Sequence, residues 1–117
     1  MSRCSRRELL SEEVRDAADL LGRRWLIQVV FAAHAGSMRF NEFRQALGDV
    51  PPRTLAARLV ELEEAGVLVR VVVDARPPRV EYRLTEEGRR LAGVVEALQA
   101  WACSRQRGCG RPPGAVG

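Results

Sequence analysis

The stretch NEFRQALGDVPPRTLAARLVELEEAG, residues 41–66, contains two amphipathic segments joined by a short turn. Asn41 can cap a first short helix, in which Phe43 and Leu47 lie four residues apart and face inward together. The letters GDVPP that follow form a turn, and Pro52 suits the first position of a second helix because no backbone donor is needed there. The sequence therefore predicts two helices connected by a tight turn.

The second helix has distinct inner and outer faces. Its inner stripe consists of Leu55, Leu59 and Leu62. On a helical wheel Arg53, Thr54 and Ala57 fall on the opposite side, and Arg58 falls at the edge of the buried stripe. This helix should pack with one face and present the other to solvent.

A β-hairpin is predicted directly after these helices. Residues 67–73 are rich in valine, and residues 80–84 alternate between apolar and polar side chains. The intervening DARPPR segment cannot continue a ladder, and it places Arg76 and Arg79 at the turn. We expect a two-stranded hairpin with a basic tip.

The hairpin is flanked by further helices. The segment from Trp25 to Ala33 is apolar nearly all round, which is typical of a central buried helix, and Gly36 should end it. Residues 37–40 are a candidate for a short third strand. Thr85 can cap a long final helix.

An amphipathic first helix is predicted over at least residues 12–21. Ser11 is a plausible N-cap, with acidic residues in the first turn that follows. A competing start at Ser5, with Glu8 completing a capping box, would extend the helix toward the N-terminus. Both alternatives keep the same apolar stripe.

This order of elements predicts a mostly helical α+β fold, a winged helix-turn-helix with a two- to three-stranded antiparallel sheet and a helix at each end. We expect an N-terminal arm over residues 1–11, a domain over 12–103, and a disordered tail rich in Arg, Gly and Pro over 104–117. In such folds the second helix enters the major groove of DNA and the wing meets the backbone or minor groove.

The composition fits this interpretation without deciding it. The 117 residues suffice for one core, no apolar run could span a bilayer, and we expect a cytosolic protein. The net charge is +4, and the basic residues are all arginines, which suit phosphates and guanine edges. Coding bias in a GC-rich genome would give the same usage.

Four phrases carry a family resemblance. They are LGRRW at 21–25, RFNEF at 39–43, RLVELE at 58–63 and PPRVEY at 77–82. In this order they resemble the HxlR family of regulators, over roughly residues 14–102. The resemblance implies a homodimer built from the terminal helices, a recognition helix at 52–65, and binding to a roughly palindromic DNA operator.

In this context the outer face of the second helix becomes a candidate DNA-reading surface, against the alternative of an ordinary solvated face. Arg53 can reach a guanine edge, and Thr54 or Ala57 can touch a thymine methyl group. Arg58 should clamp either a phosphate or an internal carboxylate. The complete predicted DNA-contact set is Arg39, Pro52, Arg53, Thr54, Ala57, Arg58, Arg76 and Arg79.

Backbone contacts are expected outside that helix. Arg76 and Arg79 flank two prolines at the wing tip, where a rigid turn holds positive charge toward the duplex. Arg39 precedes the short helix that should cross the backbone. Asn41 suits a cap or a contact equally.

Apolar positions on the terminal helices are the predicted dimer interface. They are Val14, Leu21, Leu91, Val94, Val95, Leu98 and Trp101. Trp25 and Trp101 lie in apolar helical stripes, which favours core or interface positions over ligand sites. Partial packing of the last helix on its own domain is the alternative.

The remaining chemistry-bearing residues predict no enzyme site. Cys4, Cys103 and Cys109 lie near the chain ends, where a redox switch or incidental thiols are both open interpretations. They make no Cys-x-x-Cys pair, His34 is the only histidine, and we expect no metal, no cofactor and no catalysis. A small-molecule effector is not identifiable. A winged helix used only for protein association is the competing function.

Overall fold

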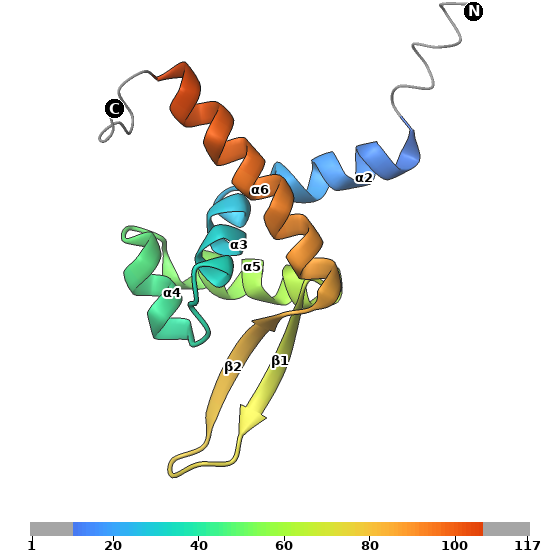
Figure 1. Ribbon diagram of the computed structural model, residues 1–117. Helices are drawn as coiled ribbons and strands as arrows, with labels where there is room; N and C mark the ends of the chain where they lie inside the picture. Colours follow the sequence, from blue (N-terminus) through green and yellow to red (C-terminus); the bar gives the residue numbers. More distant parts are fainter. Residues whose placement is uncertain (1–10, 107–117) are drawn as a thin grey trace, which may run out of the picture.

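The computed structural model describes residues 11–106 (Figure 1). Within this range the elements are α2 (Glu12–Leu21), α3 (Leu26–His34), α4 (Phe40–Leu47), α5 (Pro52–Glu64), β1 (Leu68–Val73), β2 (Arg79–Leu84) and α6 (Glu86–Arg105). The predicted winged helix-turn-helix order is confirmed. Helix α6 continues two residues into the segment predicted as a tail, whose remainder from residue 107 lies outside the described range.

The sheet of the described chain has two strands. β1 and β2 pair antiparallel, from Leu68 opposite Leu84 to Val73 opposite Arg79. The third strand predicted at 37–40 is wrong, because this segment makes one ladder-like bond, from the Tyr82 N–H to the Met38 carbonyl at 2.8 Å, before helix α4 begins. Figure 1 shows the hairpin projecting away from the helical body as the wing.

Helix α3 lies at the centre of the fold, as its apolar sequence predicts. The side chains of Leu26, Val29 and Val30 are fully buried. The other helices and the base of the wing pack around them, and the fully buried large side chains they contribute are Phe43, Leu55, Leu59, Leu62 and Leu68. This core fixes α4 and α5 relative to each other and to the wing.

Two of the three predicted helix caps are confirmed. The Ser11 hydroxyl accepts the Val14 N–H at 3.3 Å, and the Thr85 hydroxyl accepts the Gly88 N–H at 3.0 Å. The competing start with Ser5 and Glu8 lies outside the described residues. These hydroxyl groups satisfy N–H groups that have no partner within their helices.

The predicted Asn41 cap is wrong, because helix α4 begins at Phe40 and its N-cap is Arg39, two residues before Asn41. The Glu42 Oε1 atom accepts the backbone N–H groups of Met38 and Arg39, at 2.8 and 3.0 Å. A glutamate at the third helical position reaching back to the cap is one half of a capping box. Asn41 is thereby left without a capping role.

Trp25 has an unusual backbone. Its φ of +74° is in the left-handed region, which a bulky side chain rarely adopts, and its carbonyl accepts the Val29 N–H at 3.0 Å. This conformation costs on the order of 1–3 kcal/mol. The turn at residues 22–25 is therefore held by the packing of α3 and not by local preference.

The start of α6 passes very close to the start of the wing. A Cβ atom built on Gly88 would lie 2.1 Å from the Val67 carbonyl oxygen. The same carbonyl accepts the Thr85 N–H at 3.0 Å. Only glycine fits here, so residue 88 sets the angle at which α6 leaves the sheet.

Candidate nucleic-acid interface

Helix α5 presents a partly exposed outer face. Arg53 is exposed beside Pro52, while Thr54 and Ala57 are half-buried. These two are more covered than the helical wheel predicts, because α5 packs against α3, α4 and β1 and not against a single neighbour. Arg53 is thus the most accessible of the predicted base contacts.

Two exposed residues of this face were not predicted. Ala56 and Val60 are exposed, and Val60 retains 48% of its accessible surface. They follow Arg53 by three and seven residues, so all three lie on one side of the helix. The helical spacing from Arg53 is the sequence signal that indicates these two apolar residues.

Arg58 pairs with an internal carboxylate, which is one of the two roles predicted for it. Its Nε donates to the Arg24 carbonyl at 2.8 Å and its Nη1 to the Glu61 Oε1 at 2.6 Å. Arg23 also pairs with Glu61, at 3.2 Å. Burial raises the pKa of Glu61, but the hydrogen bonds from Arg58 and Arg23 outweigh it and hold that pKa below 4.5. This cluster ties α5 to the turn before α3.

We expect Glu61→Gln to lower stability at neutral pH and to have little effect in acid. The folded pKa of Glu61 is depressed, so its contribution is complete above the ordinary value of about 4.5 and is lost as pH falls through the folded value. Urea unfolding of both proteins between pH 3 and 7 would check this, with the range set around that pKa. A difference in unfolding free energy between the two proteins that stays constant with pH would contradict this prediction.

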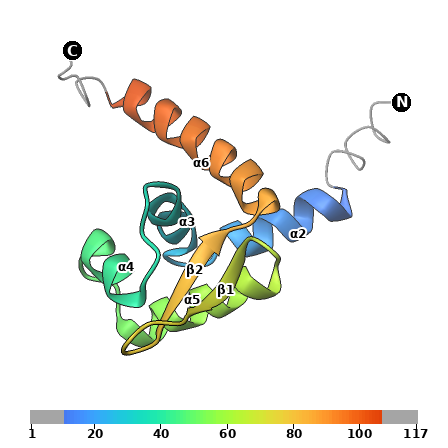
Figure 2. The same ribbon diagram turned by 60° about the horizontal axis from the view of Figure 1, so that its bottom comes forward.

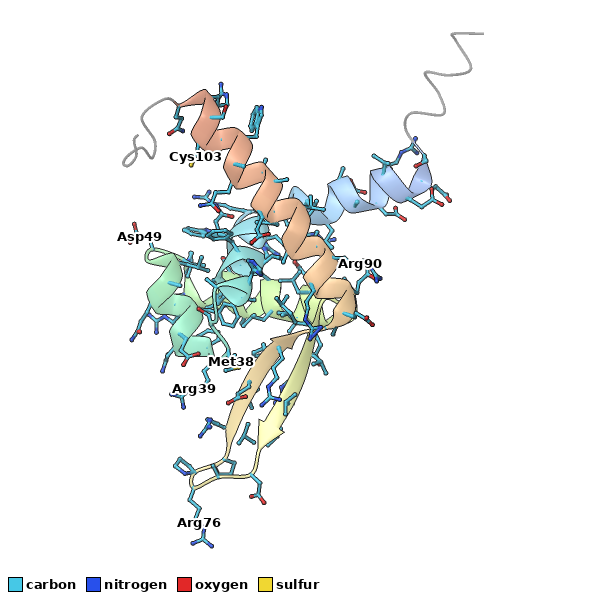
Figure 3. The ribbon with its side chains drawn as sticks, viewed as in Figure 1. Met38, Arg39, Asp49, Arg76, Arg90 and Cys103 are labelled. Carbon is cyan, nitrogen blue, oxygen red and sulfur yellow. The ribbon has the colours of Figure 1, made fainter. Side chains whose placement is uncertain are left out.

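The wing carries three charged side chains on one face of β2. Glu81 is buried, with 6% of its surface accessible. Its carboxylate accepts from Arg79 Nε at 3.2 Å and from Arg83 Nε and Nη2 at 3.1 and 2.7 Å. Hydrogen bonds from Arg83 and then Arg79 hold the pKa of Glu81 below its ordinary value. Arg76 points outward from the wing tip (Figure 3).

Arg39 lies at the start of α4 and points from the helical body toward the side of the wing (Figure 3). Its side chain is 51% exposed, and its Nε lies 3.7 Å from Glu42 Oε2. Hydrogen bonds from the Met38 and Arg39 backbone hold the pKa of Glu42 below its ordinary value. Arg39 is therefore accessible, with a charged carboxylate behind it.

The predicted dimer residues divide into two groups. Val95 is buried within its own chain, and Leu21 and Leu91 pack partly against that core. Placing Val95 in a dimer interface was therefore wrong, because its side of α6 faces α3. Four residues remain exposed: Val14, Val94, Leu98 and Trp101. Figures 1 and 2 show α2 and the far end of α6 extending away from the helical body.

An apolar groove of about 700 Å³ lies between α3, α4 and α6. Its lining includes Trp25, Phe31 and Leu98, and no charged side chain contributes to it. Trp101 lies outside the groove, with the Arg105 guanidinium 5.1 Å from its ring centre. Trp25 thus lines an apolar groove, and Trp101 lies on the exposed surface of α6.

The thiol and imidazole side chains are dispersed over the described residues. Cys103 is half-buried near the end of α6, and Cys4 and Cys109 lie outside the described range. His34 pairs with Glu96 at 2.6 Å and so links α3 to α6. Residues 11–106 contain no group of three side chains suited to holding a metal ion, and none of their helices is long and apolar enough to cross a membrane.

Comparison with known proteins gives consistent results. The model of the HxlR-like helix-turn-helix family matches residues 20–107. The HTH-type transcriptional regulator YvaP of Bacillus subtilis is 42% identical over 86 residues, which cover 74% of this chain and 80% of the relative. YodB of the same organism, also an HTH-type transcriptional regulator, is 36% identical over 90 residues, covering 77% and 80%.

Solved structures agree with these sequence matches. The reduced form of YodB superposes with a TM-score of 0.72 at 34% identity, covering 80% of this chain and 91% of that structure. The reduced form of the redox regulator HypR gives 0.74 at 36% identity, covering 81% and 94%. The chain belongs to the HxlR-like helix-turn-helix family and is a transcriptional regulator of the helix-turn-helix type.

Proposed function

We propose that this regulator binds a palindromic operator as a homodimer and represses transcription from it. The observation that carries the proposal is the exposed Arg53 at the start of a helix whose other face is anchored in the core. A guanidinium held there can meet a guanine edge, while the wing arginines meet phosphates.

The homodimer rests on the exposed apolar stripe of α6. Val94, Leu98 and Trp101 are between 40% and 61% exposed in the single chain, which is a large apolar surface for one helix. A two-fold axis through this stripe would present two recognition helices, and major grooves on one face of DNA repeat about every 34 Å.

A salt titration tests DNA binding. The protein is titrated onto a duplex from upstream of its own gene and onto an unrelated duplex of equal length. We expect tight upstream binding whose affinity falls steeply with salt. Two results together would favour the protein-association alternative: weak, equal binding to both duplexes, and no tightly bound sequence recovered by selection from random DNA.

The recognition helix and wing should make separable contributions. We expect Arg53→Ala to reduce the preference for the operator by a factor of about ten, because a base contact discriminates between sequences. We expect Arg76→Ala to weaken both duplexes equally and to reduce the salt slope by about one. Identical effects of the two substitutions on both quantities would contradict this division.

The proposal extends to a response to oxidants. Solved relatives include diamide-treated YodB and the oxidised form of the redox regulator HypR. This chain has three cysteines, at least one of which, Cys103, lies on the helix proposed to form the dimer. The same titration after mild oxidation, with a variant carrying serine at all three positions, should show a change in affinity in the wild type alone.

A further inference from the structure

We propose that Arg39 and Arg79 hold a single phosphodiester of the DNA backbone between them. The inference rests on the proposed DNA binding and adds a defined site to it. The site is a cleft of about 630 Å³ where the start of α4 meets the start of β2. Its lining consists of Arg39, Phe40, Asn41, Glu42, Gln45, Arg79 and Val80.

The fold brings the two arginines together from distant parts of the sequence. The bond from the Tyr82 N–H to the Met38 carbonyl, at 2.8 Å, joins β2 to the segment just before α4. Arg39 follows this bond on one chain segment, and Arg79 begins the strand on the other. Two permanent positive charges therefore flank one concave surface, which favours an anion.

Each arginine is paired with a carboxylate. Glu42 faces the Nε of Arg39 at 3.7 Å, and Glu81 accepts the Nε of Arg79 at 3.2 Å. Among the described residues, the terminal Nη atoms of Arg39 and Arg79 donate no hydrogen bond, and the shortest ion-pair contact of each side chain is through Nε. Arg79, which is held by a hydrogen bond through Nε, keeps its terminal donors for a ligand and loses less entropy on binding, whereas the 3.7 Å ion pair leaves the exposed Arg39 free to adjust to that ligand.

The negative charges near the cleft are already engaged. Glu42 Oε1 accepts two backbone N–H groups, and Glu81 accepts from Arg83 as well as from Arg79. Both pKa values are lowered, so both groups are charged at neutral pH and act as anchors for the arginines. The second oxygen of Glu42, Oε2, lies on the cleft and faces the Nε of Arg39.

Two neutral amides complete the site. Asn41 is not a helix cap in this structure, and both it and Gln45 are exposed on the same cleft, one helical turn apart. Amide side chains commonly donate hydrogen bonds to phosphate oxygens without reading sequence. The cleft between α4 and the wing therefore presents charged and neutral donors to a tetrahedral anion.

A double-mutant cycle on an unrelated duplex tests the shared phosphate. We expect Arg39→Ala and Arg79→Ala each to weaken binding by about tenfold. The double variant should lose little more than either single variant, because the two side chains serve one group. A loss equal to the product of the single losses, about a hundredfold, would assign them to separate phosphates and overturn the proposal.

Arg83→Ala is the matched control. Arg83 pairs with the same Glu81 and is similarly exposed, but it does not line the cleft. We expect Arg83→Ala to weaken DNA binding by less than about threefold. A loss of affinity equal to that of Arg79→Ala would show that the loss comes from removing any positive charge on the wing, and not from the cleft. If the wild type bound no duplex, the proposed function would fail first, an outcome distinct from either result.

Glu81→Gln separates positioning from charge by the sign of its effect. If Glu81 only offset positive charge, its loss would strengthen DNA binding. Because it holds Arg79, we expect affinity to fall by about threefold, although the protein becomes one unit more positive. Tighter binding by this variant, with its fold verified by circular dichroism, would contradict the positioning role.

Discussion

Replacing Gly88 with alanine is expected to destabilise this protein by at least about 3 kcal/mol. The added methyl group would lie 2.1 Å from the Val67 carbonyl oxygen and 2.9 Å from the Leu84 side chain. The leucine can move, but the carbonyl belongs to the backbone and accepts the Thr85 N–H. Relief requires α6 to shift away from the sheet. Thermal unfolding should show a decrease in melting temperature of more than about 10 °C.

Gly93→Ala provides the matched control within the same helix. A Cβ atom there meets nothing within 4 Å. Because alanine is the better helix former, we expect unchanged stability or a gain of up to about 1 kcal/mol. Equal losses at the two positions would show that α6 tolerates no added methyl group anywhere, and that the contact with Val67 is not the cause.

Trp101→Glu is expected to convert the proposed dimer into a monomer and to lower operator affinity by about a hundredfold or more. Trp101 is 61% exposed and is absent from the groove lining, so the single chain does not depend on it for packing. A carboxylate at that position would have to be buried unpaired in the dimer. Sedimentation velocity and the operator titration would measure both effects.

Ala100→Glu is the control for that substitution. Residue 100 is also exposed and lies about 100° further round the helix, away from the apolar stripe. We expect this variant to sediment as the same dimer as the wild type and to bind the operator with unchanged affinity. A dimer that survives Trp101→Glu would place the interface elsewhere, and the exposed stripe of α6 would then need another explanation.

Local sequence signals predicted the elements that depend on local chemistry. Ser11, Pro52 and Thr85 begin helices where their side chains predict, since a cap or a first-turn proline acts within a few residues. The alternating pattern of the wing likewise gave its strands to within one residue. The apolar run after Trp25 correctly identified the central helix.

The errors share a dependence on distant partners. The segment at 37–40 has strand-like residues, but a single bond to Tyr82 and the Glu42 side chain decide its conformation. Val95 looked available for a partner because a wheel does not show which side of α6 meets α3. The burial of Glu81 between two arginines was equally invisible, since alternation along a strand does not identify the covered face.

Helix α2 has no fully buried side chain in the single chain, and only Leu20 and Leu21 at its end pack partly against the core. Its 10 residues are fewer than the roughly 12–15 at which isolated helices become even marginally stable in water. In the proposed dimer, the partner would supply the missing contacts. Helix formation in α2 and subunit association would then be one coupled equilibrium, governed by mass action. The apparent melting temperature should therefore rise with protein concentration, and dilution alone should reduce the helical content.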